Sequence, residues 1–473
     1  MRTRITIALA VCVALASGAQ ISLDSCRHMA LQNNKELQTQ RLKIESARYQ
    51  QKQAHAAYLP SIDLQGSYFY NQKKLDLLGE DAYLPVMNFD PATGSYQHSV
   101  VTTPEGPLIV NGQPVPQQVA YLPESAMTYD VHNVFAGALT ITQPIYMGGK
   151  IKAMNDIARL ATQLAQEQVD TKSRQIIYDV DVAYWQVVSL RAKQHLAQSY
   201  VELITSLDND VKRMVSEGVA TKSNQLSVDV KLNEANVDLT RVNNGLVLSK
   251  MHLAQLCGMN ISQDFTLADE NRDSVPVSLR QTSFNMNDVY ANRSEIRSLE
   301  IATQIFDGKA RAERAAMLPK IAAMGMYSVT NPNTFKGFQK KFGGAFSVGA
   351  TIMIPLWHWG GLSNKYKQAQ TEARIKRIEL ADAKDKIELQ VNQASFRYQE
   401  AVKTLQATKS NLASAEENLR MAQVAFREGV STTDEVMAAQ TAWLKANSEK
   451  IDAEIDVQLC DVYLSKVLGT LEY

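Results

Sequence analysis

The chain has 473 residues, and its 49 basic and 49 acidic side chains give a formal net charge of zero. This balance excludes the basic surface typical of a nucleic-acid-binding protein. The seven histidines are scattered without a zinc spacing or a nucleophile motif, so the sequence predicts no enzyme, no metal site and no cofactor.

The first nineteen residues have the pattern of an export signal. Arg2 and Arg4 precede the apolar run 5–16, and residues 17–19 are the small side chains expected before a cleavage site. A lipoprotein signal at Cys12 is the alternative, but Val11 occupies the position where a small residue is needed. Three cysteines remain after residue 19, an odd number without metal-type spacing, and they imply no disulfide framework.

The remainder of the chain is an internal duplication. Residues 135–258 recur as residues 346–469 at a constant shift of 211, and residues 33–60 recur as residues 292–319 at a shift of 259. A period near 200 is too long for a solenoid repeat. The pattern predicts a first repeat over 20–258, a joining segment over 259–286 that packs around the middle of the molecule, and a second repeat over 287–473.

Each repeat contains two strand signals. Apolar and polar residues alternate over about 61–70, 134–144, 320–329 and 346–355. Nine or ten residues suit a tilted transmembrane β-strand. Aromatic residues at the strand ends are typical of a membrane interface, although soluble sandwiches also place aromatics there. These aromatics are Tyr58, Tyr146, Trp357 and Trp359.

The two strands of the first repeat are separated by an insertion over residues 71–130. It holds seven of the thirteen prolines, which predicts loop rather than helix. By topology we expect the insertion to be extracellular.

A very long helix follows the strands of each repeat. Residues 150–216 and 362–427 contain neither glycine nor proline, and each run would form a rod of roughly 100 Å. In the second run, large and small residues alternate on a 3-4 spacing from Val391 to Phe426, which favours antiparallel helices packed side by side. The first run keeps this register but includes Gln194 and Asp208. The helices alone are equally compatible with a soluble coiled-coil rod.

The strands favour a membrane protein. Four strands cannot close a barrel, and an open sheet edge in lipid leaves backbone groups unpaired at several kcal/mol each. Twelve strands from three chains would close the wall, and the long helices would continue beneath it as a tube.

This order of elements resembles the TolC-type outer-membrane efflux proteins of Gram-negative bacteria. The shared features are the duplicated Leu-Pro before a strand pair, the very long helix, the Glu-Gly-Val-x-Thr turn and the shorter return helix. The resemblance implies a mainly α fold with a small transmembrane β part. Three chains would form a 12-stranded β-barrel in the outer membrane, continued by a periplasmic α-helical barrel.

The resemblance also implies where partners bind. It assigns the two turns to the periplasmic rim, where the hairpin tips of a periplasmic adaptor protein would dock. The residues concerned are Glu217, Gly218, Val219 and Thr221 in the first turn, and Glu428, Gly429, Val430 and Thr432 in the second. Tight turns with no binding role are the alternative interpretation.

Family members close the periplasmic entrance with carboxylates on the return helix. Glu435 occupies that position here, with Asp434 beside it, while the equivalent in the first repeat is the uncharged Asn224. Ala438 stands where some members have a second acid, and Phe426 and Ser431 replace the usual tethering residues near the turn. We therefore expect a gate with different closing contacts, or else a simply solvated helix face.

The function implied is the exit duct of a tripartite efflux system. Its partners would be two further copies of the chain, outer-membrane lipid, an adaptor and an inner-membrane pump of the RND or ABC type, with no nucleic acid. Type I protein secretion and a periplasmic structural coiled-coil protein remain as alternatives. The sequence does not define the cargo.

Overall fold

The computed structural model describes residues 20–270 and 284–471, so the predicted export signal and part of the joining segment lie outside the described residues. The chain forms two compact units. The helical unit comprises the described parts of Met1–Ala54, Lys152–Arg311 and Asn364–Tyr473, and the β unit comprises His55–Ile151 and Ala312–Ser363. Each unit therefore takes segments from both sequence repeats.

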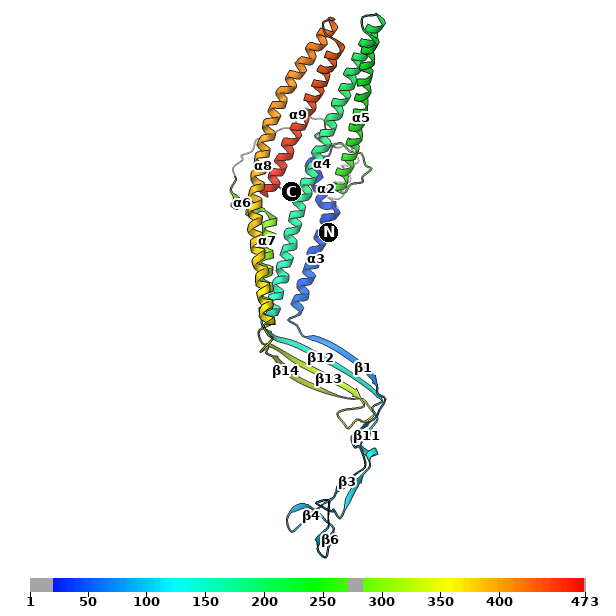
Figure 1. The fold of residues 1–473 in the computed structure, drawn as a ribbon, viewed down its shortest axis with the longest axis vertical. Helices are drawn as coiled ribbons and strands as arrows, with labels where there is room; N and C mark the ends of the chain where they lie inside the picture. Colours follow the sequence, from blue (N-terminus) through cyan, green and yellow to red (C-terminus); the bar gives the residue numbers. More distant parts are fainter. Residues whose placement is uncertain (1–19, 271–283, 472–473) are drawn as a thin grey trace, which may run out of the picture. The chain divides into compact units, whose positions relative to one another are not determined.

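The helical unit is built mainly from two long hairpins (Figure 1). Helix α4 (Lys150–Ser216) and α5 (Lys222–Cys257) form the first, and α8 (Gly361–Arg427) and α9 (Thr433–Leu468) form the second. Each long helix has 67 residues because no glycine or proline interrupts it. The shorter helices are α2 (Leu23–Asn33), α3 (Lys35–Ala56), α6 (Met286–Asn292) and α7 (Ser294–Ala315).

The seam predicted on the second long helix is the packed face of α8. Val391, Ala394 and Tyr398 are buried against α9 and α6. The polar seam residues of α4 have partners instead: the Gln194 side chain donates to Asn243 Oδ1 on α5 at 2.6 Å, and Lys212 Nζ donates to Asp208 at 2.5 Å. Each bond offsets part of the cost of placing a polar group in the seam, although Asp208 Oδ1 stays without a hydrogen-bond partner among the described residues.

The start of the first repeat and the joining segment both pack against the middle of α4. Arg27 of α2 forms a two-pronged ion pair with the fully buried Asp181, with N–O distances of 2.8 and 2.6 Å. From the joining segment, Leu267 is buried in the same core and pairs with Ile21 in a parallel bridge. The described part of the joining segment thus packs on the helices of the first repeat.

The β unit contains one four-stranded antiparallel sheet in the order β1-β12-β13-β14, as Figure 1 shows. Its strands are β1 (Ser61–Tyr70), β12 (Asn133–Met147), β13 (Lys320–Asn331) and β14 (Gly343–Met353). One repeat supplies β1 and β12 and the other supplies β13 and β14, so the two halves of the duplication pair through β12 and β13. Strands β1 and β14 form the two edges.

The insertion between β1 and β12 contains short strand pairs rather than continuous loop. Strand β2 (Leu75–Asp76) pairs with β11 (Thr128–Tyr129), and β3 (Ala82–Pro85) pairs with β10 (Val119–Leu122). Three small hairpins and a 3-10 turn (Glu124–Met127) complete it: β4 (Met87–Asp90) with β5 (Ser95–His98), β6 (Thr102–Thr103) with β7 (Gly106–Pro107), and β8 (Ile109–Val110) with β9 (Gln113–Pro114). No residue between 71 and 130 is buried in the single chain.

Candidate channel tips and membrane sheet

The first tip joins α4 to α5. Gly218 has φ +78°, the left-handed conformation that ends a helix, and Val219 N donates to Met214 O at 2.8 Å to close the turn. Thr221 is the N-cap of α5 and accepts a hydrogen bond from Asn224 N. Val219 is 70% exposed. The first tip therefore presents an apolar side chain on a turn fixed by its own backbone.

The second tip repeats this geometry between α8 and α9. Gly429 has φ +73°, and Val430 N donates to Ala425 O at 2.8 Å. Val430 is 82% exposed, and Thr432 caps α9. A Cβ atom at Gly218 or Gly429 would meet nothing within 4 Å, so the requirement for glycine comes from backbone conformation and not from lack of space.

Glu435, the predicted gate residue, belongs to a capping box. Its carboxylate accepts from Thr432 N at 2.9 Å and from the Ser431 hydroxyl at 2.6 Å, while Thr432 Oγ1 accepts from Glu435 N. These donors lower the pKa of Glu435, the Ser431 hydroxyl most strongly. The Ser/Thr-x-x-Glu spacing over 432–435 was a signal for this box that the sequence analysis missed.

Asp434 differs from its neighbour. It is exposed, and its carboxylate makes no hydrogen bond or ion pair with another described residue. It lines a surface depression with Lys231, Met437 and Thr441, so it lies on the side of α9 toward the first hairpin. Both predicted gate residues are exposed, and Asp434 is the one whose carboxylate accepts no hydrogen bond from a described residue.

The two tips are connected to each other. Asn224 Nδ2 donates to Thr433 Oγ1 at 3.3 Å, and the same amide accepts from the Thr221 hydroxyl through Oδ1. Beneath the tips, side chains from all four long-hairpin helices form one core that includes Ile204, Val228, Phe426 and Val436. Phe426 is therefore a packing residue of this core.

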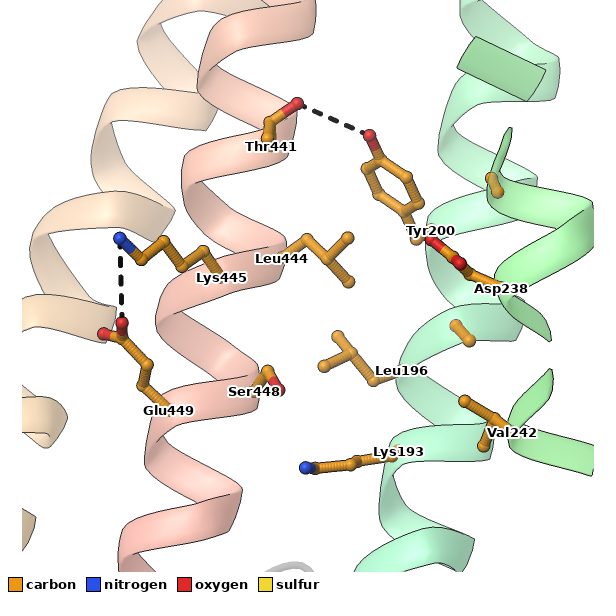
Figure 2. A pocket seen from close by; sticks show the side chains of 12 residues that line it. Lys193, Leu196, Tyr200, Asp238, Val242, Thr441, Leu444, Lys445, Ser448 and Glu449 are labelled. Atoms are coloured by element: carbon orange, nitrogen blue, oxygen red, sulfur yellow. Dashed lines mark hydrogen bonds and ion pairs between the residues drawn. The ribbon is translucent and has the colours of Figure 1, made fainter. Parts of the chain in front are cut away.

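Below this core the hairpins separate around a cavity of about 380 Å³ (Figure 2). Leu196 on α4 faces Leu444 on α9 across it, and Val242 on α5 also lines it. Tyr200 hydrogen-bonds to Thr441 at 3.5 Å at one end. Lys193 lies at the other end and pairs with Asp452 at 2.6 Å. Around this cavity the hairpins are joined by polar contacts at both ends, in addition to the apolar core beneath the tips.

The two faces of the β sheet differ in polarity. Paired residues on neighbouring strands share a face, and Leu64, Leu139, Tyr327 and Phe346 form one apolar row across all four strands. The adjacent row on the other face is Asp63, Thr140, Met326 and Ser347. Leu64 is 81% and Phe346 80% exposed, so the apolar face has no protein covering within the single chain.

Aromatic side chains mark both ends of the sheet. The predicted set lies at the end of the sheet formed by Ser61, Met147, Lys320 and Met353. The backbone oxygen of Tyr58 accepts a hydrogen bond from the Gln143 side chain, and Tyr146 follows a register shift in β12. The rings of Trp357 and Trp359 pack edge to face beyond β14. The sequence analysis missed a second group at the opposite end, where the ring of Phe135 lies 4.9 Å from Tyr68 and 6.3 Å from Phe342.

No group of three or more His, Cys, Asp or Glu side chains among the described residues is arranged to hold a metal ion. None of the described helices combines the length and apolar character needed to cross a membrane.

Two duplicated helical hairpins with a four-stranded sheet, apolar on one face and bounded by aromatics, define the class of outer-membrane channel proteins. The family model described as outer membrane efflux protein matches residues 26–259 and 285–470. The chain belongs to this family, which confirms the resemblance inferred from its sequence. It is an outer-membrane efflux channel that extends into the periplasm, and not an enzyme.

Solved structures agree with this assignment. The chain is similar to CusC, described as forming a transmembrane channel, with 16% identity and a TM-score of 0.74 over 95% of this chain and 92% of the other. It is also similar to the outer membrane protein VceC of Vibrio cholerae (14%, TM-score 0.70, 94% and 96% covered) and to the MtrE outer membrane channel of Neisseria gonorrhoeae (17%, TM-score 0.69, 94% and 88% covered). At these identities the shared property is the fold. No curated protein sequence matches the chain significantly.

Proposed function

We propose that three copies of this chain assemble into the exit duct of a tripartite efflux system. The observation that carries the proposal is the four-stranded sheet, because its two edges, β1 and β14, are unpaired in the single chain. In lipid such edges are strongly unfavourable. Joining β1 of one copy to β14 of the next pairs every edge, and three copies supply twelve strands.

The two faces of the sheet support a water-filled pore. The apolar row from Leu64 to Phe346 would face lipid, and the row from Asp63 to Ser347 would face water. The aromatic groups at both ends of the sheet suit the two membrane interfaces. Strand β1, with ten residues, has the length of a tilted transmembrane strand. The insertion over 71–130 follows from the far end of β1, which supports an extracellular position.

The tips of the helical hairpins would receive the periplasmic adaptor. Val219 and Val430 are exposed on turns of nearly identical backbone geometry, and a trimer would present six of them. A rigid, repeated apolar surface favours binding, since little conformational entropy is lost on contact. The adaptor would connect the duct to an inner-membrane pump of the RND or ABC type.

The periplasmic gate would open by separation of the two hairpins. The hydrogen bond from Asn224 to Thr433 and the bond from Tyr200 to Thr441 both cross between the hairpins. The cavity below the tips leaves few packing contacts there for this separation to break. Asp434 and Glu435 would place a ring of carboxylates near the entrance, and Asp434 would interact more strongly with passing ions because its charge is unpaired.

Photo-crosslinking in cells would test the docking arrangement. A photoreactive amino acid at Val219 or Val430 should capture a periplasmic protein with a helical hairpin, identified by mass spectrometry. The control is the same photoreactive amino acid at Val237, which is half exposed on α5 away from the tip. This control variant should not capture the hairpin protein. Capture of only further copies of this chain from both tips would contradict the proposal.

A further inference from the structure

Two buried cysteines lie next to each other in the helical unit. Cys26 is on α2 and Cys257 is the last residue of α5, and both are completely inaccessible to solvent. The Cys257 thiol lies 3.6 Å from the backbone oxygen of Cys26. The residues are 231 positions apart in sequence, so only the fold brings them together.

The backbones around this pair approach closely. Gly258 has φ +69°, and a Cβ atom there would lie 2.6 Å from Asn33 Cβ, so the end of α5 is packed directly on α2. Asn34 Nδ2 also donates to Leu256 O at 3.3 Å. A disulfide requires Cβ atoms about 3.5–4.5 Å apart, which is possible only for backbones in this kind of direct contact.

The duplication provides an internal comparison. In the second repeat, Gly469 packs on Asn292 as Gly258 packs on Asn33. The positions equivalent to Cys257 and Cys26 there are Leu468 and Asn285. The same helix contact is therefore made without cysteine, and both cysteines occur together in one repeat and are absent together from the other. Packing alone does not require them.

We propose that Cys26 and Cys257 form a disulfide in the exported protein. The helices of this channel lie in the periplasm, an oxidising compartment in which disulfides persist. One thiolate would attack the disulfide of a thiol–disulfide oxidoreductase and form a mixed disulfide. The second thiolate would then displace the enzyme, so the protein loses two protons and two electrons and the oxidoreductase leaves as a dithiol.

The order of events follows from burial. The pKa of Cys26 is raised well above its usual range by its neighbour Cys257 and by burial, so the folded thiol stays protonated and unreactive. No oxidoreductase can reach either sulfur once α2 has packed on α5. The bond would form during folding, before this contact closes, and would then be protected from reduction. Cys460 lies on α9, in a different core cluster.

Peptide mass spectrometry tests the proposal directly. Cells are quenched in acid, and the channel is then denatured in the presence of iodoacetamide, which alkylates every free thiol. The protein is purified without reductant and digested with trypsin. We expect the peptide that ends at Arg27 to be linked to the peptide 251–272 that contains Cys257, with both released only by reduction. The peptide 451–466 should carry alkylated Cys460 and is the matched control.

A variant separates this link from chance oxidation. In Cys257→Ser, Cys26 should become alkylated without reduction, and no linked peptide should remain. Direct alkylation of Cys26 and Cys257 in the unreduced wild-type protein, or linkage of either to Cys460, would overturn the proposal. Light scattering of native protein, purified in mild detergent from the same culture, reports the trimer independently, so failure of the link and failure of assembly are distinguishable.

Discussion

Asn224 and Thr433, 209 positions apart, join the two helical hairpins at their tips through a hydrogen bond of 3.3 Å. Thr433 is almost fully buried, whereas Asn224 is held on the other side by Thr221. The uncharged residue at the first-repeat equivalent of the gate position thus links the hairpins. Its contact with the second repeat makes it a candidate for controlling the periplasmic entrance.

Removing this link should favour the open entrance. A net hydrogen bond contributes about 1 kcal/mol, so Asn224→Ala in three chains would shift the open–closed balance by about 3 kcal/mol, on the order of 100-fold. Single-channel recording in planar bilayers should show higher resting conductance. Asn243→Ala is the control, because it removes a bond to Gln194 within a single hairpin. Equal conductance for Asn224→Ala and wild type would contradict this role.

Charge at the tips should block adaptor docking. Asp and Asn both tolerate the left-handed conformation of Gly218 and Gly429 and are nearly the same size. Gly218→Asp with Gly429→Asp should therefore abolish efflux while the trimer stays in the outer membrane, and the double Asn variant should retain most activity. Efflux assays at matched expression decide the matter. Full activity in the double Asp variant would show that the rim is not the docking surface.

Ion selectivity should depend more on Asp434 than on Glu435. The Glu435 carboxylate is engaged by Ser431 and Thr432, whereas Asp434 makes no such bonds with the described residues. Asp434→Asn should lose much of the cation preference in reversal-potential measurements. Glu435→Gln should lose less and assemble normally, because Gln can also complete a capping box. The reverse ranking would place Glu435 at the pore axis.

The capping box should weaken in acid. The pKa of Glu435 is lowered in the folded protein, so its stabilising contribution is fully present above the ordinary value of 4.5 and is lost as the pH falls through the lowered value. Hydrogen exchange of a peptide covering the start of α9 should show protection falling from pH 6 to pH 3.5 relative to Glu435→Gln, which does not titrate. A constant ratio between the two proteins would refute this.

The sequence predicted those features that repeat or have a strong period. The four strands follow from alternation, and the long helices follow from the absence of glycine and proline between Gly149 and Gly218 and between Gly361 and Gly429. The order of these elements is specific enough to indicate the family, and the match to the family model confirms both the family and the channel function.

Contacts between distant residues could not be predicted in the same way. The bond from Asn224 to Thr433 and the pairing of Cys26 with Cys257 depend on how hairpins pack, which no local pattern encodes. The strand pairs inside 71–130 are only two to four residues long, too short for a clear period. The capping box was accessible to sequence analysis, but its Glu435 was interpreted as a gate residue.

The mass of the purified particle tests the central claim most directly, because the edge strands β1 and β14 can be paired with each other only between different chains. Light scattering, corrected for bound detergent, should report three chains of about 52.5 kDa or slightly less per particle. We expect this trimer to persist in mild detergent, with no stable membrane-inserted monomer. A particle containing one chain would contradict the shared barrel and the account of the channel built on it.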